Sequence, residues 1–143
     1  MKSIFYIADD IQTLQSGKLM MVGVYADHII IAHIPKEEQV KMTKETPGAI
    51  SQLCVVITVT DITSGDHQGY VELLRPDGSS VHKQEVPVVV FPGHRSFNLI
   101  LRFAPFQFIE AGTYTLRTTV GEETVDDTFQ IVFQDPGTMA AAH

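Results

Sequence analysis

The residues best suited to do chemistry are three aspartates at the ends of the first two predicted strands. Asp9 and Asp10 close the first apolar segment, and Asp27 follows the second one beside His28. If these strands pair, the carboxylates meet at one end of the fold, and calcium takes roughly six to eight oxygen ligands of this kind. We therefore treat Asp9, Asp10 and Asp27 as candidate metal ligands. The alternative is that they mark strand ends, where Asp side chains bond to nearby backbone.

The other reactive groups do not form catalytic or ligand motifs. The six histidines lack the spacing of known metal motifs, and the single cysteine, Cys54, has no second cysteine with which to form one. Apolar neighbours predict that Cys54 is a buried, inert thiol. Adjacent carboxylates such as Asp126 and Asp127 point to opposite faces of a strand, which makes them poor acid–base partners. The sequence therefore predicts no catalytic residue, no cofactor and no enzymatic activity.

A second kind of candidate is a pair of phenylalanines between two predicted strands. Phe106 and Phe108 bracket Gln107 after Pro105, and so short a segment has little room to bury two large rings. Exposed aromatic rings are enriched at protein–protein interfaces. We take Phe106 and Phe108 as candidate partner-binding residues, with packing in the core as the alternative. The chain has no tryptophan, which disfavours a sugar-binding platform.

Composition limits the classes of partner. Of the 143 residues, 44% are hydrophobic and 19% charged, a balance typical of a globular domain. The net charge is −7, whereas affinity for nucleic acid needs basic residues that neutralise phosphates. We expect neither nucleic acid nor membrane as a partner. One cysteine, and no secretory signal in residues 1–10, lead us to expect a cytoplasmic protein.

Short apolar segments separated by Gly, Pro and Asp turns run along the chain. Residues 53–60 form the clearest strand, since apolar side chains occupy both of its faces. Residues 70–74 and 79–86 flank a Pro-Asp-Gly turn and predict a hairpin. Residues 18–25 are also apolar on both faces, which predicts a central, covered strand. The remaining predicted strands are residues 3–8, 29–32, 96–103, 113–120 and 124–133.

These strands predict an all-β fold, a single antiparallel immunoglobulin-like β-sandwich of about seven to nine strands. Residues 1–134 are expected to form one domain and residues 135–143 a flexible C-terminal tail. The polar segment 35–48 interrupts the strands as a long loop or a helical turn. Long loops in compact domains often carry function. This segment is therefore the first place to expect contact with a partner, with a plain solvated crossover as the alternative.

The immunoglobulin-like assignment rests on the sequence Glu-Ala-Gly-Thr-Tyr that ends at Tyr114. This spacing is typical of a tyrosine corner, in which the Tyr hydroxyl bonds to upstream backbone. Together with Gly-Lys-Leu at 17–19, Gly-Val-Tyr at 23–25 and Leu-Arg-Pro-Asp-Gly at 74–78, the chain resembles a family of small uncharacterised bacterial proteins over residues 3–133. The resemblance implies an immunoglobulin-like sandwich and brings no activity with it.

These features predict a non-enzymatic interaction or structural module that binds another protein or itself. A free edge strand would allow a homodimer by strand addition, although the sequence does not identify that strand. The alternative is a calcium- or carbohydrate-binding module that uses the strand-end carboxylates or exposed aromatic rings.

Overall fold

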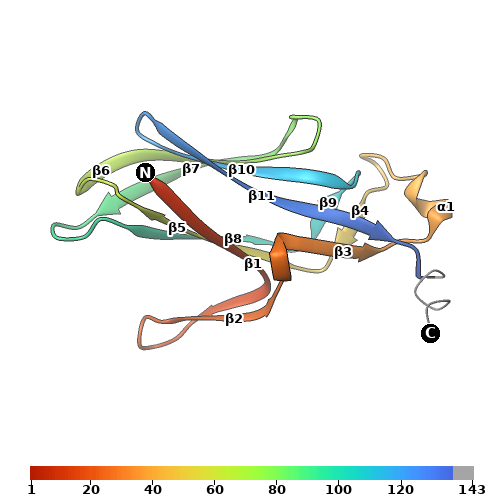
Figure 1. Cartoon of the computed structure of the whole chain (residues 1–143), viewed down its shortest axis with the longest axis horizontal. Coiled ribbons are helices and arrows are strands. Elements are labelled where there is room, and N and C mark those ends of the chain that lie inside the picture. Colours follow the sequence, from red (N-terminus) through yellow and green to blue (C-terminus); the bar gives the residue numbers. More distant parts are fainter. Residues whose placement is uncertain (137–143) are drawn as a thin grey trace.

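The computed structural model describes residues 1–136 and shows an all-β protein with two very short helices (Figure 1). The helices are η1 (Ala26–His28) and α1 (Lys36–Gln39). The strands are β1 (Lys2–Thr13), β2 (Leu19–Val24), β3 (Ile29–His33), β4 (Gly48–Ile50), β5 (Leu53–Thr60), β6 (Gly65–Leu74), β7 (Ser80–Val90), β8 (Phe97–Phe103), β9 (Phe106–Phe108), β10 (Gly112–Val120) and β11 (Glu123–Gln134). Of the predicted tail, residues 137–143 lie outside the described part of the chain.

The strand count is higher than predicted because two short strands form where loops were expected. Eleven strands lie in the described residues. The extra two are β4, at the end of the polar segment 35–48, and β9, in the segment of the two phenylalanines. These strands pair antiparallel, with Ala49 opposite Gln107. The pairing orders two segments that the sequence leaves without structure.

Two larger sheets contribute to one hydrophobic core. The strand order is β2-β1-β5-β8 in one sheet and β3-β11-β10-β6-β7 in the other. The main cluster takes Ile7 and Ile57 from the first sheet, and Leu73 and Leu116 from the second. Each of these side chains is at most 1% exposed. Because full burial of one such side chain contributes about 1.5–3 kcal/mol, this cluster is the main source of stability.

One strand pairing departs from the antiparallel prediction. β3 runs parallel to β11, with Ile31 opposite Val132. The change of direction follows from η1, in which Asp27 and His28 both have a φ of 55° and redirect the chain from the first sheet to the second. The His28 ring stacks on Phe5 at 4.2 Å between centroids and anchors this turn to β1.

Two local predictions are confirmed. β6 and β7 form the expected hairpin around a turn in which Gly78 has a φ of 87° and the Ser79 N–H donates to the Asp77 carboxylate at 2.8 Å. The Tyr114 hydroxyl donates to the backbone oxygen of Glu110 at 2.7 Å, which is the predicted tyrosine corner. Burial raises the pKa of Tyr114 to about 12. The hydroxyl therefore remains a donor at any physiological pH.

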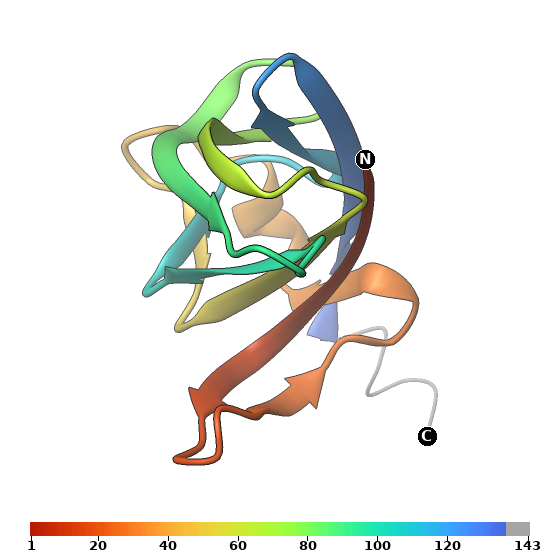
Figure 2. The ribbon, with the colours of Figure 1, turned by 90° about the vertical axis from the view of Figure 1, so that its left-hand side faces the viewer.

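β2 is an edge strand, so the prediction of a central, covered strand is wrong. Among the described residues it pairs only with β1, and the β1–β2 hairpin projects from the rest of the molecule (Figure 2). The paired register skips Asp9 and Gly23. At Gly23 the φ is 68°, and a Cβ atom there would lie 2.4 Å from an oxygen of the Asp9 carboxylate. The hairpin bends at this position because only glycine fits it.

The apolar pattern of β2 has a different cause from the one predicted. Leu19 and Met21 pack with Ile11 against Cys54 and Ile100 in a second, smaller cluster. The hairpin thus covers the outer face of β5 and β8. The opposite face of β2 remains exposed to solvent, so an apolar side chain on both faces does not mean that both faces are covered.

Candidate functional site

A groove between β3 and β4 is the strongest candidate for a binding site. Its volume is about 670 Å³, within the roughly 300–1,000 Å³ typical of ligand clefts. Residues 31–34 form one wall, residues 46–50 form the other, and Glu38, Lys41, Met42 and Phe108 complete the lining. We call this site the β3–β4 groove. The segment 35–48, predicted as the first place for a partner contact, thus supplies part of its lining.

The floor of the groove is apolar and tightly packed. Phe108 is only 3% exposed and packs against Phe133 at 5.7 Å between ring centroids. A Cβ atom added at Gly48 would lie 2.5 Å from Phe108 and 2.9 Å from the Met42 sulfur. The backbone of β4 therefore lies directly on these side chains. An apolar group that enters the groove would meet a preformed surface.

Phe106 and Phe108 are buried, so the expectation of exposed rings is wrong and the alternative of packing in the core holds. Phe106 is 1% exposed and makes edge-on contacts with Phe103, Tyr114 and Phe129. The rings reach the core because β9 pairs with β4 and points alternate side chains inward, while Gln107 faces out. Phe108 still contributes to the candidate site, as part of its floor.

The β3 wall presents an open strand edge. β3 is the outermost strand of its sheet in the described residues. The Ile34 N–H donates to the Gln134 oxygen of β11 at 3.0 Å. Since alternate residues of a strand turn their backbone groups to alternate sides, Ile31 and His33 direct theirs away from β11. These groups form a short row of donors and acceptors that an added strand can pair with.

The helical turn beside the groove is fixed to β3. The Gln39 side chain donates to the Ile34 backbone oxygen at 2.8 Å, which ties α1 to the end of the strand. Glu38 and Lys41 lie at the rim, where both are exposed. The polar segment thus closes one end of the groove and puts charges only at its mouth.

The candidate metal ligands do not converge. No group of three or more His, Cys, Asp or Glu side chains that could hold a metal ion occurs in residues 1–136. Asp9 accepts a hydrogen bond from the Tyr25 hydroxyl at 2.8 Å, whereas Asp10 pairs with Arg102 at 3.1 Å. Asp27 lies in η1. Neighbouring residues of one strand face opposite sides, and this separates the carboxylates that the sequence placed together.

These ion pairs and hydrogen bonds join β1 to its neighbours. Hydrogen bonds from the Gln12 side chain, and then from the Ile11 N–H, Arg102 and Gln52, hold the pKa of Asp10 below its usual value. Burial and the hydrogen bond to Asp9 raise the pKa of Tyr25 to about 12. The role of both aspartates in this structure is to fix the β1–β2 hairpin.

Cys54 is buried, as predicted. Arg102 nevertheless donates to its sulfur at 3.6 Å, a cationic neighbour that the sequence did not reveal. Arg102 also donates to the backbone oxygen of Ile11. Because the hairpin covers this sulfur, solvent reaches it only when the hairpin moves.

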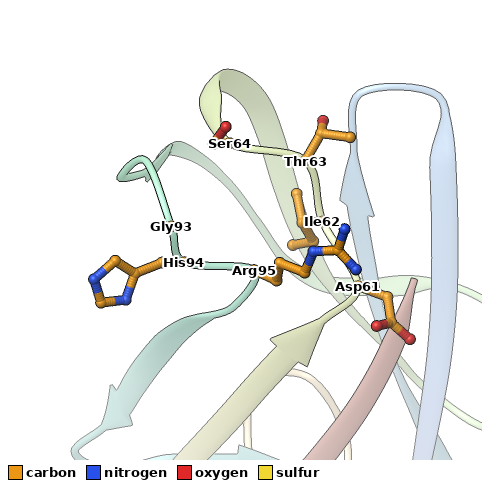
Figure 3. Close-up of a pocket in the computed structure, with 7 residues that line it drawn as sticks. All are labelled: Asp61, Ile62, Thr63, Ser64, Gly93, His94 and Arg95. Carbon is orange, nitrogen blue, oxygen red and sulfur yellow. The ribbon is translucent and has the colours of Figure 1, made fainter.

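A second cavity lies at the far end of β5 and holds polar residues that include Asp61, Ser64, His94 and Arg95 (Figure 3). Its volume is about 440 Å³. Figure 3 shows His94 pointing outward from its loop, while Ser64 and Asp61 point in opposite directions. Asp61 lies 3.9 Å from Lys2 in an exposed ion pair. These side chains do not meet at a common point, as a nucleophile and its base must.

The sequence pattern missed most of the groove because its walls come from separate parts of the chain. The length and polarity of segment 35–48 did indicate a contact with a partner there. The open edge of β3 depends on the parallel pairing with β11, which short apolar runs do not reveal. The sequence singles out Phe108 as a candidate, but its buried place in the floor of the groove depends on the pairing of β4 with β9.

Residues 3–133 match a family of unknown function, DUF6941. The chain belongs to this family. The match confirms that the chain resembles a family of uncharacterised proteins over these residues. Among solved structures, this DUF6941 chain is similar to an immunoglobulin-like protein from Pseudomonas aeruginosa, with 14% identity, a TM-score of 0.39, and coverage of 88% of this chain and 96% of that one. No curated protein matches the chain.

Proposed function

We propose that this DUF6941 chain is a non-enzymatic, immunoglobulin-like β-sandwich module that binds an extended segment of a protein partner in the β3–β4 groove. One observation supports this proposal above others: an open strand edge at Ile31 and His33 lies beside an apolar floor at Phe108. Strand addition uses this combination, because backbone hydrogen bonds provide affinity and pockets for alternate side chains provide specificity.

The groove defines the chemistry of the bound segment. Its backbone pairs with the outward N–H and C=O groups of Ile31 and His33. Side chains on one face of the segment then meet Met42 and Ile50, so apolar residues are expected at alternate positions. The exposed Glu38 and Lys41 affect the rate of association more than the affinity.

No observation in the described residues favours the calcium or carbohydrate alternative. The carboxylates of Asp9 and Asp10 are engaged by protein groups, and the sequence contains no tryptophan. A small apolar ligand in the same groove is the competing occupant. The experiment below separates it from a peptide strand.

A cytoplasmic location, with no nucleic acid or membrane as a partner, is also part of the proposal. It rests on the single cysteine and the net charge of −7. Within residues 1–136, no helix combines the length and the apolar character that crossing a bilayer requires.

The proposal is tested by selecting binders from a random peptide library and measuring their Kd for three variants by calorimetry. Ile31→Pro removes an outward N–H at an edge position where strands tolerate proline. Met42→Ala removes an apolar side chain from the groove lining, and Val40→Ala, at a residue that is 85% exposed and outside the lining, is the control. We expect both groove variants to raise Kd at least about tenfold, or about 1.4 kcal/mol, and Val40→Ala to leave it unchanged.

Two results would count against this function. A selection in which no binder depends on Met42 or Ile31 contradicts binding in the groove. If Met42→Ala abolishes binding while Ile31→Pro leaves it intact, the groove holds an apolar ligand without strand pairing.

A further inference from the structure

In residues 1–136, no strand lies beside the outer edge of β2, which is at the opposite side of the four-stranded sheet from β8. Its residues, Leu19 to Val24, include no charge and no proline. Met20 is 41% exposed and Val22 is 49% exposed, although both are apolar. An exposed, uncharged strand edge is a template for pairing with another strand.

Two other sheet edges carry the features that discourage such pairing. β7 contains Lys83, Glu85 and Pro87, and β8 contains Arg102. Charged side chains and proline are the usual protection of edge strands against association. Between Leu19 and Val24, β2 has neither of these features, so its edge lacks this protection.

The hydrogen-bonding groups of this edge can be assigned from the hairpin. The Leu14 N–H donates to the Lys18 oxygen at 2.8 Å, so Lys18 turns its backbone groups toward β1. Antiparallel pairs alternate along the strand. Met20 and Val22 therefore also face β1, whereas Leu19 and Met21 direct their N–H and C=O groups outward.

Two glycines limit the regular part of the strand. Gly17 has a φ of 82° and Gly23 a φ of 68°, both outside the extended region. The regular stretch is thus Lys18 to Val22, and Met20 is its centre. A strand that pairs symmetrically with an identical strand places its central residue on the two-fold axis.

We propose that a second copy of this chain pairs antiparallel along β2, with the two-fold axis between the two Met20 residues. Leu19 of each copy then lies opposite Met21 of the other, which aligns four outward N–H and C=O pairs. Lys18 lies opposite Val22 of the second copy, whose neighbour in β1 is Asp10. The only charge on the regular stretch is therefore directed toward an acidic residue of the other copy.

This dimer is independent of the β3–β4 groove, since none of the groove residues lies on β2. It also explains how two chains of net charge −7 can associate. The contact strand itself has no carboxylate, and the remaining repulsion is long-range and screened by salt. The dimer is expected to tighten as ionic strength rises.

The register is tested by sedimentation of three variants at Val22, compared over a dilution series. Val22→Gln removes the apolar side chain without adding charge and is the reference. Val22→Glu places a carboxylate opposite Lys18 of the other copy, and Val22→Lys places two ammonium groups opposite each other. We expect the dimer Kd to fall about threefold or more in Val22→Glu and to rise about threefold or more in Val22→Lys, relative to Val22→Gln.

The direction of these changes excludes a general charge effect. On an acidic protein, added Lys lowers the overall repulsion and added Glu increases it, which is the opposite order. The same three substitutions at Val89, which is 51% exposed on β7, are the matched control and should show only this general effect, with Val89→Lys dimerising no more weakly than Val89→Glu. A wild-type chain that stays monomeric up to about millimolar concentration, or an order in which Val22→Lys dimerises more tightly than Val22→Glu, would overturn the proposal.

Discussion

At the scale of single residues, burial and alternation decide which reactive side chains are available. Cys54 was predicted to be buried from its apolar neighbours alone, and it is. Asp9, Asp10 and Asp27 are candidate ligands because pairing of the first two strands would bring strand ends together, but Asp9 is bonded by Tyr25 and Asp10 is paired with Arg102. The sequence of Phe106 and Phe108 predicts exposed rings because it does not reveal that their segment pairs with β4. Local chemistry is thus predictable where it depends on neighbours in sequence, and less so where it depends on pairing.

Gly23 offers a direct test at this scale. Gly23→Ala places a residue with a side chain at a φ of 68° and brings its Cβ to 2.4 Å from the Asp9 carboxylate. Gly17→Ala, at a φ of 82° with nothing within 4 Å, is the matched control. A left-handed backbone costs a residue with a side chain about 1–2 kcal/mol. We expect urea unfolding to show that loss for Gly17→Ala, and a loss at least about 1 kcal/mol larger for Gly23→Ala. Equal losses would mean that Asp9 moves aside without cost.

At the scale of elements, the sequence predicted the strands with local signals and missed those that need long-range information. β5 and the β6–β7 hairpin follow from alternation and turn residues. Apolar residues on both faces of β2 predict a central strand. In the structure one face packs in the smaller cluster that contains Cys54, and the other lies in solvent. The parallel pairing of β3 depends on η1, whose positive φ values fall on Asp27 and His28 and not on glycine.

One substitution is expected to weaken the packing of the β1–β2 hairpin over Cys54. Ile11 is fully buried in the cluster that contains Cys54. Ile11→Ala should lower the stability of this contact by about 2–5 kcal/mol and expose the thiol by local opening. We expect Cys54 to react with a thiol reagent at least about tenfold faster than in the wild type, at denaturant concentrations below global unfolding. Ile131→Ala, in the main core, is the control that lowers overall stability without freeing the hairpin. An equal increase in the reaction rate of Cys54 in both variants would show that the hairpin does not shield the thiol.

At the scale of the whole molecule, the two candidate surfaces are both strand edges. The β3–β4 groove and the outer edge of β2 belong to different sheets and share no residue. Family membership over residues 3–133 and the all-β class could be predicted from turn and core motifs. The positions of the open edges could not be predicted. A strand is an edge strand when no other strand pairs with one of its sides, and the sequence does not show which strands pair. Together, the two proposals describe a molecule that binds a partner segment at one edge and a second copy of the chain at the other.

The most direct test of the proposed function is amide hydrogen exchange at β3, measured by NMR with and without a peptide selected on the groove. The outward N–H groups of Ile31 and His33 should exchange markedly more slowly when the peptide pairs with them. The Ile34 N–H, already bonded to Gln134 at 3.0 Å, should change little and serves as the internal reference. Slower exchange at Ile31 and His33 is the result that we predict. Unchanged exchange at both, with the peptide bound, would contradict strand addition at the β3–β4 groove.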